Sequence, residues 1–301
     1  MKNNNVSTNW LESAKILSQA LPFMKRNAGQ TIVIKYGGHA MEDASMSQLF
    51  ARDIVLLRQV GSNPIVVHGG GPQIESMLQK LNIKNDFVHG LRVTDENTIE
   101  IVEMVLSGSI NKKIVSEINK AGGSAVGLSG KDGHLILAKK IGGMGDDYKE
   151  GSKDPIDLGF VGEPKEIKSH ILTFFTESDV TPVIAPIGYS LENETLNINA
   201  DVAAGAIASA TNARRLLMLT DVAGILDANG ILIPQLTISE TRKLIDRGLI
   251  SGGMIPKAET CIAAVESGIG GAVIIDGRVP HAILLELFTE HGVGTLICPD
   301  N

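Results

Sequence analysis

The chain has 301 residues, 43% of them hydrophobic and 20% charged, which allows one large or two moderate domains of ordinary globular composition. Its net charge of −7 argues against a nucleic-acid binder, whose phosphate contacts need an excess of Lys and Arg, and no apolar run is long enough to span a membrane. Because the polar N-terminus shows no signal peptide and the two cysteines have no metal-ligand spacing, we expect a cytoplasmic protein with reduced thiols and no metal site of its own.

The first predicted element is an N-terminal helix that follows a disordered stretch at residues 1–8. Pro22 is expected to kink or end this helix. Apolar side chains recur at helical spacing along one side of it, at Trp10, Ala14, Leu17 and Leu21. We treat residues 1–25 as an appendage whose apolar stripe must be buried against its own domain or a neighbouring subunit.

The stretch 31–38, Thr-Ile-Val-Ile-Lys-Tyr-Gly-Gly, predicts a buried strand that ends at a lysine and a glycine turn. Three consecutive β-branched residues are typical of a strand that is covered on both faces, as in a parallel sheet. Lys35 at the strand end, with Gly37 and Gly38 behind it, is the arrangement with which open α/β sheets bind anions. The alternative is an exposed lysine that closes the strand before an ordinary turn.

A second strand and glycine loop follow at residues 64–72. The helix after them starts near Pro72, whose fixed φ suits a first turn. The glycines at 69–71 therefore lie at a helix N-terminus, where unpaired N–H groups and the helix dipole attract anions. With a helix predicted at 49–60, the two loops form successive strand–helix units, which indicate a parallel sheet with helices on its faces.

The next part of the chain carries an arginine before a long helical pattern. Thr94 is a good N-cap for a helix whose apolar residues run from 99 to 114. Arg92 lies just before it and, from the residues alone, is interpreted as a solvated side chain. Lys131 belongs to a near miss for a P-loop at 129–133, which we interpret as a turn. Further strands are predicted at 124–128, 135–138, 182–186, 216–219, 272–275 and 294–297, helices at 236–250 and 281–288, and an exposed hairpin or flap at 142–157.

Polar side chains gather before a helix of small apolar residues predicted at 202–210. They are Asn197, Asn199 and Asp201. A carboxylate at such a position is often only a helix cap. Alternatively, Asp201 holds two cationic side chains in place.

The last third of the chain adds three candidate positions. Thr220 and Asp221 follow a predicted strand, at the carboxyl edge of a sheet. A glycine loop and Met254 lead into a helix that carries Lys257. A new strand–helix series starts after 211–215, so we expect the hinge between two lobes there.

Six motifs occur in order along the chain. They are Lys-Tyr-Gly-Gly at 35–38, His-Gly-Gly-Gly-Pro at 68–72, Gly-Leu-Arg-Val-Thr at 90–94, Asn-Ile-Asn-Ala-Asp at 197–201, Thr-Asp-Val-Ala-Gly-Ile at 220–225 and Gly-Gly-Met-Ile-Pro-Lys at 252–257. From about residue 26 to the C-terminus, the chain thereby resembles the amino-acid kinase family. The third and fourth motifs point to the branch of that family that phosphorylates N-acetyl-L-glutamate.

The resemblance implies an α/β fold, a three-layer αβα sandwich with a mainly parallel central sheet and two lobes. It implies an amino-acid substrate lobe at 26–211 and an ATP-binding lobe at 212–301, after the N-terminal helix at 1–25. The implied kinase reaction moves the γ-phosphoryl group of ATP, which enters with Mg²⁺, to the side-chain carboxylate of N-acetyl-L-glutamate, in arginine biosynthesis. Because that carboxylate is already ionised at neutral pH, the reaction needs positioned cations rather than a general base.

The resemblance also implies roles for individual residues. Lys35 would contact the phosphoryl group in flight, Lys257 the phosphates on the leaving side, and Asp201 would orient both lysines. Arg92 would bind a substrate carboxylate, for which a planar bidentate donor is suited, and Asn197 would bind the amino-acid end of the substrate. Substrate contacts are also expected from Gly70 and Gly71, and phosphate or nucleotide contacts from Gly37, Gly38, Thr220, Asp221 and Met254.

Arginine-inhibited members of the family carry an N-terminal helix of this kind, which joins dimers into a hexameric ring. The run 281–295 resembles those members too. The resemblance therefore implies a homohexamer, a trimer of dimers, that L-arginine inhibits, with His281 and Glu290 near the effector. The alternative is that these residues only pack the last helix.

Three other functions remain open. A sibling kinase for glutamate, aspartate, carbamate or a nucleoside monophosphate would share the sheet and both lysines, but Arg92 and Asn197 argue against it. A catalytically silent nucleotide- or amino-acid-binding regulator would not need Lys35, Asp201 and Lys257 together. A dinucleotide-dependent dehydrogenase lacks support because no Gly-x-Gly-x-x-Gly fingerprint opens a helix after either early strand.

Overall fold

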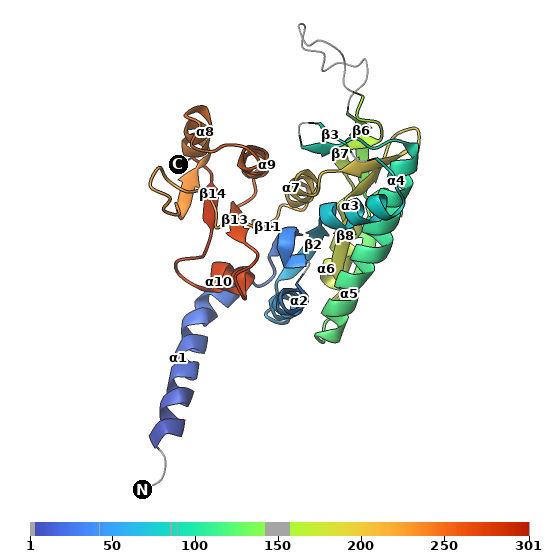
Figure 1. Ribbon diagram of the computed structural model, residues 1–301. Coiled ribbons are helices and arrows are strands. Elements are labelled where there is room, and N and C mark those ends of the chain that lie inside the picture. Colours follow the sequence, from blue (N-terminus) through green and yellow to red (C-terminus); the bar gives the residue numbers. More distant parts are fainter. Residues whose placement is uncertain (1–3, 42, 85, 89, 142–156, 301) are drawn as a thin grey trace.

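The computed structural model describes residues 4–41, 43–84, 86–88, 90–141 and 157–300. An eight-stranded sheet forms the centre of the described chain (Figure 1). Its strands, in spatial order, are β12 (Gln235–Thr237), β14 (Thr295–Cys298), β13 (Ala272–Asp276), β11 (Arg215–Thr220), β1 (Thr31–Tyr36), β2 (Asn63–His68), β8 (Thr181–Ala185) and β5 (Ala125–Ser129). All neighbouring strands are parallel except β13 and β14, so the sheet is mainly parallel, as predicted.

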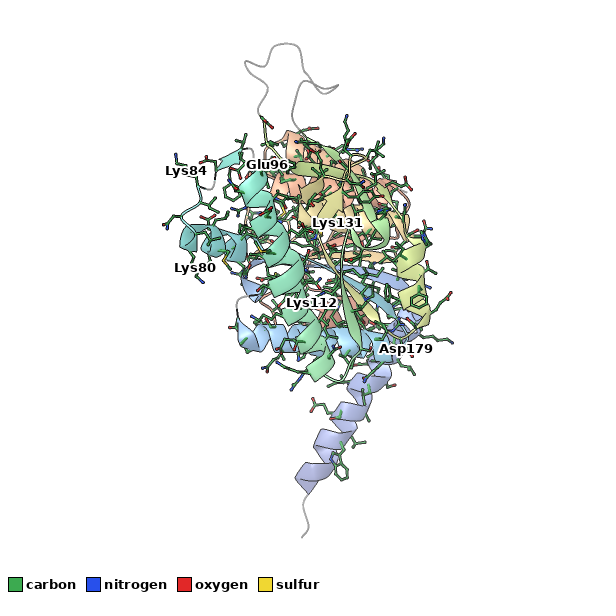
Figure 2. All side chains as sticks on the ribbon, turned by 90° about the vertical axis from the view of Figure 1, so that its right-hand side faces the viewer. Lys80, Lys84, Glu96, Lys112, Lys131 and Asp179 are labelled. Carbon is green, nitrogen blue, oxygen red and sulfur yellow. The ribbon has the colours of Figure 1, made fainter. Side chains whose placement is uncertain are left out.

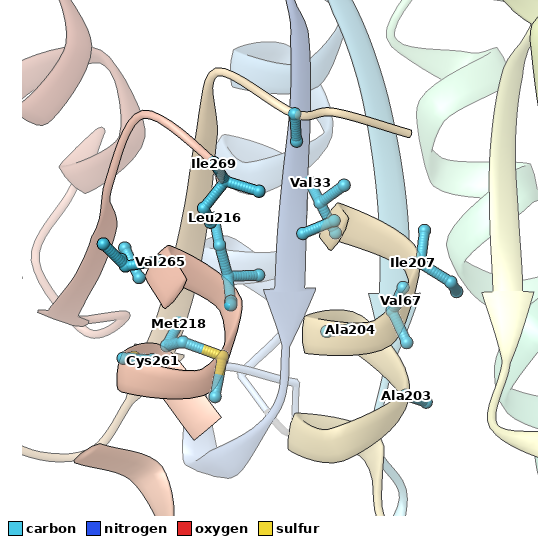
Figure 3. Close-up of a cluster of buried hydrophobic side chains, with 14 of the residues drawn as sticks. Val33, Val67, Ala203, Ala204, Ile207, Leu216, Met218, Cys261, Val265 and Ile269 are labelled. Atoms are coloured by element: carbon cyan, nitrogen blue, oxygen red, sulfur yellow. The ribbon is translucent and has the colours of Figure 1, made fainter. Parts of the chain in front are cut away.

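Helices cover both faces of this sheet, which confirms the predicted αβα sandwich. One core contains residues of α2 (Ala44–Gln59), α3 (Gly71–Lys80), α4 (Glu96–Glu103), the π-helix η2 (Met104–Ile110), α5 (Asn111–Lys120) and α10 (Ala282–Phe288). The other contains residues of α6 (His170–Glu177), α7 (Ala200–Ala210), α8 (Ile238–Asp246) and α9 (Met254–Glu266). Figure 3 shows part of this second core, where the small side chains Ala203 and Ala204 let α7 lie close to the sheet.

The alternation of side chains along β1 decides where its lysine points. Ile32 and Ile34 belong to the first core and Val33 to the second. Because side chains alternate along a strand, Lys35 lies on the same face as Val33. That is the face covered by α7 and α9.

A small closed barrel and a hairpin complete the sheets. The barrel consists of β10 (Thr195–Ile198), β7 (Val161–Ile167), β6 (Ile136–Lys140) and β9 (Ile187–Tyr189). The hairpin consists of β3 (Phe87–Val88) and β4 (Leu91–Arg92), and two short 3₁₀ helices are η1 (Gly38–Met41) and η3 (Asp132–His134). Only β6 was predicted as a strand, because β7 contains Pro164 and charged residues and β9 has only three residues. The flap predicted at 142–157 falls, up to residue 156, outside the described residues.

Helix α1 (Asn4–Asn27) projects from the body of the molecule next to α10 (Figure 1). The helix includes residues 4–8, so the disorder predicted for them is wrong, and it continues past Pro22 instead of ending there. Its end packs on the first core, but Trp10, Leu17 and Leu21 are 72%, 65% and 63% exposed. The chain therefore does not bury this stripe itself. No helix of the described residues, α1 included, combines the length and apolar character that crossing a membrane requires.

The long helix predicted from 99 to 114 is interrupted. Figure 2 faces the column of α4, η2 and α5, with Glu96 at its start and Lys112 farther along, and the middle section is a π-helix. The predicted N-cap, Thr94, is wrong by one residue: the Asp95 carboxylate accepts from the Thr98 N–H at 2.8 Å. Thr94 is instead buried, and its hydroxyl donates to the Arg92 carbonyl at 2.9 Å.

The helix predicted at 236–250 is also partly wrong. Leu236 belongs to the edge strand β12, where it pairs with Ile297 of β14. The helix α8 starts only after Thr237, which forms a capping box with Glu240, and it ends at Asp246. Pairing with Ile297, 61 residues away in the sequence, overrode the local helical pattern.

Candidate active site

Three charged side chains meet at the carboxyl edge of the central sheet. Lys35 Nζ lies 2.9 Å from Asp201 Oδ1, and Lys257 Nζ donates to Asp201 Oδ2 at 2.5 Å. The residues come from β1, from the first turn of α7 and from the beginning of α9. The structure thus brings together the three residues to which the resemblance assigns phosphoryl transfer. Lys35 is buried, so it is not the exposed strand-end lysine of the alternative interpretation.

The cap of α7 explains why Asp201 faces the lysines. Asn199 is the N-cap, and its Oδ1 accepts hydrogen bonds from the N–H groups of Asp201 at 2.8 Å and Val202 at 3.3 Å. Because Asn199 satisfies these N–H groups, the carboxylate of Asp201 is available to the two ammonium groups. The alternative in which Asp201 only caps the helix is therefore wrong.

Burial and charge act in opposite directions on Asp201. Its side chain is 13% exposed, and burial raises its pKa, but the charges of Lys35 and Lys257 outweigh burial and hold the pKa below the usual range. Asp201 is therefore ionised at neutral pH. Two ammonium groups around one carboxylate give the cluster a net positive charge.

A pocket opens beside this cluster. It is lined by both glycine loops, including Gly37, Gly38, Gly70 and Gly71, and by Lys35, Asp201 and the beginnings of α3 and α7. Helix N-termini and exposed glycine N–H groups favour anions. Met41 and Gln73 also line the pocket. They were not predicted, because neither a single methionine nor a single glutamine belongs to a sequence motif that indicates a binding site.

Arg92 is buried, so its interpretation as a solvated side chain is wrong. Its Nη2 donates to the carbonyl of Gly71 at 3.3 Å, and its Nη1 lies 3.4 Å from Glu75 Oε2. Burial lowers the pKa of Arg92, against the opposing effect of Glu75. Asn197 in β10 donates to the hydroxyl of Thr94 at 3.4 Å, and thus lies near the segment that carries Arg92.

Of the predicted nucleotide contacts, Gly37 and Gly38 line this pocket, and Thr220 and Asp221 lie on the β11 side of β1, opposite β2. Thr220 ends β11, the strand paired with β1, and Asp221 follows it. The Asp221 carboxylate lies against the Cα of Gly38, where a side chain would otherwise be. Met254 opens α9, the helix that carries Lys257.

The two predicted effector residues lie at opposite ends of α10. His281 precedes this helix with a left-handed backbone (φ 58°), and its Nδ1 lies 2.6 Å from Asp53 Oδ1 in α2. Burial raises the pKa of Asp53 to about 6, against the opposing effect of His281. Glu290 follows the helix and is exposed. His281 therefore has a partner within the chain, and the pair connects α10 to α2.

We expect Gly38→Ala to lower kcat/KM of the phosphoryl transfer that the resemblance implies about tenfold or more. A Cβ at this position would overlap the Asp221 carboxylate and displace the first glycine loop. Gly29→Ala is a matched control. Both glycines have a left-handed backbone, with φ of +75° and +73°, so alanine costs about 1–2 kcal/mol at each, but a Cβ at Gly29 meets nothing within 4 Å. Equal losses of kcat/KM in both variants would show that strain alone matters. Steady-state kinetics and thermal unfolding of the two variants decide this.

The arrangement is suited to chemistry between two anions. A carboxylate that bridges two ammonium groups holds them at a fixed separation, so that each can contact a different anionic group. Glycine N–H groups on one side of the pocket can neutralise further negative charge as it develops. Positioning and charge neutralisation are what phosphoryl transfer requires of a protein.

The sequence and the fold are similar to those of known proteins. The sequence pattern described as "Amino acid kinase family" matches residues 30–276. The chain is similar to the acetylglutamate kinase of Rhodospirillum rubrum, with 62% identity over 288 residues, which are 96% of this chain and 93% of that protein. It is also similar to the acetylglutamate kinase of Parvibaculum lavamentivorans, with 60% identity over 287 residues, which are 95% of this chain and 94% of that protein.

Two solved structures share the fold. The N-acetylglutamate synthase of Neisseria gonorrhoeae, complexed with coenzyme A and N-acetyl-glutamate, matches with a TM-score of 0.83 and 24% identity, over 96% of this chain and 64% of that chain. The carbamate kinase of Giardia lamblia, bound to AMP-PNP, matches with a TM-score of 0.64 and 18% identity, over 91% of this chain and all of that chain. At these identities the likeness shows the fold alone.

Proposed function

The chain belongs to the amino acid kinase family, and we propose that it transfers the γ-phosphoryl group of ATP to the side-chain carboxylate of N-acetyl-L-glutamate, as a step of arginine biosynthesis. One carboxylate oxygen attacks the γ-phosphorus, the bond from that phosphorus to the β–γ bridging oxygen breaks, and N-acetyl-L-glutamyl 5-phosphate and ADP form. The observation that carries the proposal is the pair of lysines held by one carboxylate beside two glycine loops. The similarity to acetylglutamate kinases over nearly the whole chain supports this substrate.

In the proposed mechanism the two lysines act on different parts of the reacting system. Lys35 shares a pocket with both glycine loops, so it contacts the phosphoryl group in flight. Lys257 reaches Asp201 from α9 and neutralises the phosphates on the leaving side. Asp201 keeps both ammonium groups in position and is not a base, because a carboxylate substrate has no proton to lose at neutral pH.

Substrate recognition is assigned to the side of the pocket near the second glycine loop. Gly70 and Gly71 offer N–H groups, Arg92 binds the remaining carboxylate of N-acetyl-L-glutamate, and Asn197 binds its amino-acid end. Support comes from the contact of Arg92 with the Gly71 carbonyl, which places the guanidinium at this loop. The guanidinium of Arg92 also pairs with the carboxylate of Glu75, so it already attracts an anion at this position.

The nucleotide is assigned to the other side of β1, between Gly37, Gly38, Thr220, Asp221 and Met254. Residues 26–211 and 212–301 would be the lobes for amino acid and nucleotide, joined through the pairing of β1 with β11.

Within the described residues, no group of three or more His, Cys, Asp or Glu side chains is placed to hold a metal ion. We propose that an accompanying Mg²⁺ is held mainly by phosphate oxygens and water, and that it supplies charge neutralisation.

The test is hydroxylamine trapping of the acyl phosphate formed with ATP and Mg²⁺, with N-acetyl-L-glutamate compared with L-glutamate. We expect product only from the acetylated substrate. Product from free glutamate would keep the family and reject the substrate. Binding of ATP without product from either would favour the catalytically silent regulator.

The exposed stripe of α1 supports a second part of the proposal, a homo-oligomer. Trp10, Leu17 and Leu21 form an apolar surface that this chain leaves uncovered, and a second copy is its proposed partner. We propose a hexamer, a trimer of dimers, that L-arginine inhibits. The contact of α1 with α10, which lies between His281 and Glu290, supports an effector site near these residues.

We expect Leu17→Glu to reduce the molar mass of the assembly, because it places a charge on the apolar stripe. Gln19→Glu adds the same charge to the same exposed helix away from the stripe and should leave the mass unchanged. Light scattering after size exclusion measures both.

Removal of residues 1–25 should also abolish inhibition by arginine while activity persists. A truncated chain with unchanged mass and arginine sensitivity would reject this part of the proposal.

A further inference from the structure

A buried polar pair lies directly beneath the second glycine loop. His68 ends β2 and Asn111 begins α5, and both side chains are 0% exposed. Asn111 Nδ2 lies 3.2 Å from His68 Nε2, and His68 Nδ1 lies 2.9 Å from the carbonyl oxygen of Gly69. The pair therefore connects a helix on one face of the sheet to the first residue of the loop.

The surroundings of Asn111 determine the direction of each hydrogen bond. Lys112 Nζ donates to Asn111 Oδ1 at 3.1 Å, which fixes the orientation of the amide. Its Nδ2 then faces the carbonyls of Val183 at 2.8 Å and Leu128 at 3.3 Å as well as His68, and its two N–H groups are shared among these three acceptors. The His68 Nε2 then accepts, and Nδ1 carries the proton that it donates to Gly69. Burial lowers the pKa of His68 to about 4, against the opposing effect of the Gly69 hydrogen bond, so the imidazole stays neutral.

The same column of helices also contacts the loop through apolar atoms. A Cβ at Gly70 would overlap the side-chain ends of Ile110 and lie 2.7 Å from Leu106 Cδ2, both from the π-helix η2. Asn111 is the residue that directly follows η2. The π-helix thus presents two apolar side chains to Gly70 and, one residue later, the amide that holds His68. π-Helical segments are often found at functional sites.

We propose that His68 and Asn111 are positioning residues, which hold the loop at 69–71 so that the N–H groups of Gly70 and Gly71 face the reacting groups. This inference rests on the proposed function for its effect on catalysis. Neither side chain lines the pocket beside Lys35 and Asp201. They act by fixing the carbonyl of Gly69, and with it the orientation of the peptide groups that follow.

Two substitutions of His68 separate its two hydrogen bonds. In His68→Asn the side-chain amide can occupy the position of Nδ1 and still donate to Gly69. In His68→Gln it reaches the position of Nε2 and leaves Gly69 without its donor. Ser62→Ala is the control, because it removes another buried hydrogen bond, from Ser62 Oγ to the Asn27 carbonyl, just before the opposite end of β2.

We expect His68→Gln to lower kcat on the order of 10- to 100-fold with little change in KM for ATP, and His68→Asn to stay within about threefold of the wild type. In hydrogen–deuterium exchange, a peptide that spans residues 69–74 should exchange faster in His68→Gln and in Asn111→Ala than in the wild type. Ser62→Ala should change neither kcat nor this exchange.

Equal losses of kcat in His68→Asn and His68→Gln would overturn the proposal, as would unchanged exchange of the 69–74 peptide in His68→Gln and Asn111→Ala. Those results would mean that His68 and Asn111 contribute only to the packing of the core. A wild-type protein that forms no acyl phosphate, but whose variants show the expected exchange, would reject the proposed function and support the positioning of the loop.

Discussion

Lys35→Met is expected to lower kcat for acyl-phosphate formation on the order of 10²- to 10³-fold. Methionine has nearly the volume of lysine, so the variant should keep the packing of β1 while it removes the ammonium from the pocket. Asp201 retains Lys257 as a partner at 2.5 Å, so the carboxylate is not left without a counter-charge. Because the lost interaction serves the transferring group, KM for N-acetyl-L-glutamate should change far less than kcat.

Lys131→Met is the matched control for this prediction. Lys131 also forms an ion pair, with Glu103 at 2.8 Å, and its Nζ donates to Thr195 Oγ1 at 2.8 Å, but it lies in the turn after β5. The variant removes the same charge and an ion pair of similar length outside the pocket. Activity should persist in Lys131→Met. Comparable losses in the two variants would mean that Lys35 has no special part in catalysis.

Asp201→Asn is expected to lower kcat on the order of 10²-fold and the free energy of unfolding by about 3–5 kcal/mol at neutral pH. The substitution leaves Lys35 and Lys257 near each other without the carboxylate that held them. The two ammonium groups should then move apart and lose their alignment with the phosphates. Steady-state kinetics and urea unfolding measure the two effects.

The pH dependence gives a second test of Asp201. Its folded-state pKa is lowered, so the stability that its charge contributes is present above the unfolded pKa of about 3.9 and is lost as pH falls through the folded pKa. The difference in unfolding free energy between wild type and Asp201→Asn should therefore be constant near neutral pH and shrink below about pH 4. A difference that does not change down to pH 3 would contradict the ion-pair role.

The regular elements that could be predicted were those with strong local signals. Short β-branched runs marked β1 and β2, helical spacing after a proline marked α3, and a run of small apolar residues marked α7. Of the barrel strands only β6 was predicted, because β7 and β9 are stabilised by their neighbours and not by their own composition. Leu236 was assigned to a helix for the same reason: its strand exists only through pairing with β14.

The sequence by itself determined which residue types the site contains and that they lie at strand ends. A strand that is followed by lysine and glycine is a local pattern, so residues next to each other in the chain are enough to reveal it. Only the tertiary structure decided that Lys35 and Lys257, from opposite parts of the chain, share Asp201, because such contacts depend on how β1, α7 and α9 cross. It also decided that Arg92 is buried and that the stripe of α1 is exposed, since burial is set by packing between distant segments. His68 shows the same division: its motif was visible in the sequence, but its partner Asn111, forty-three residues away, was not.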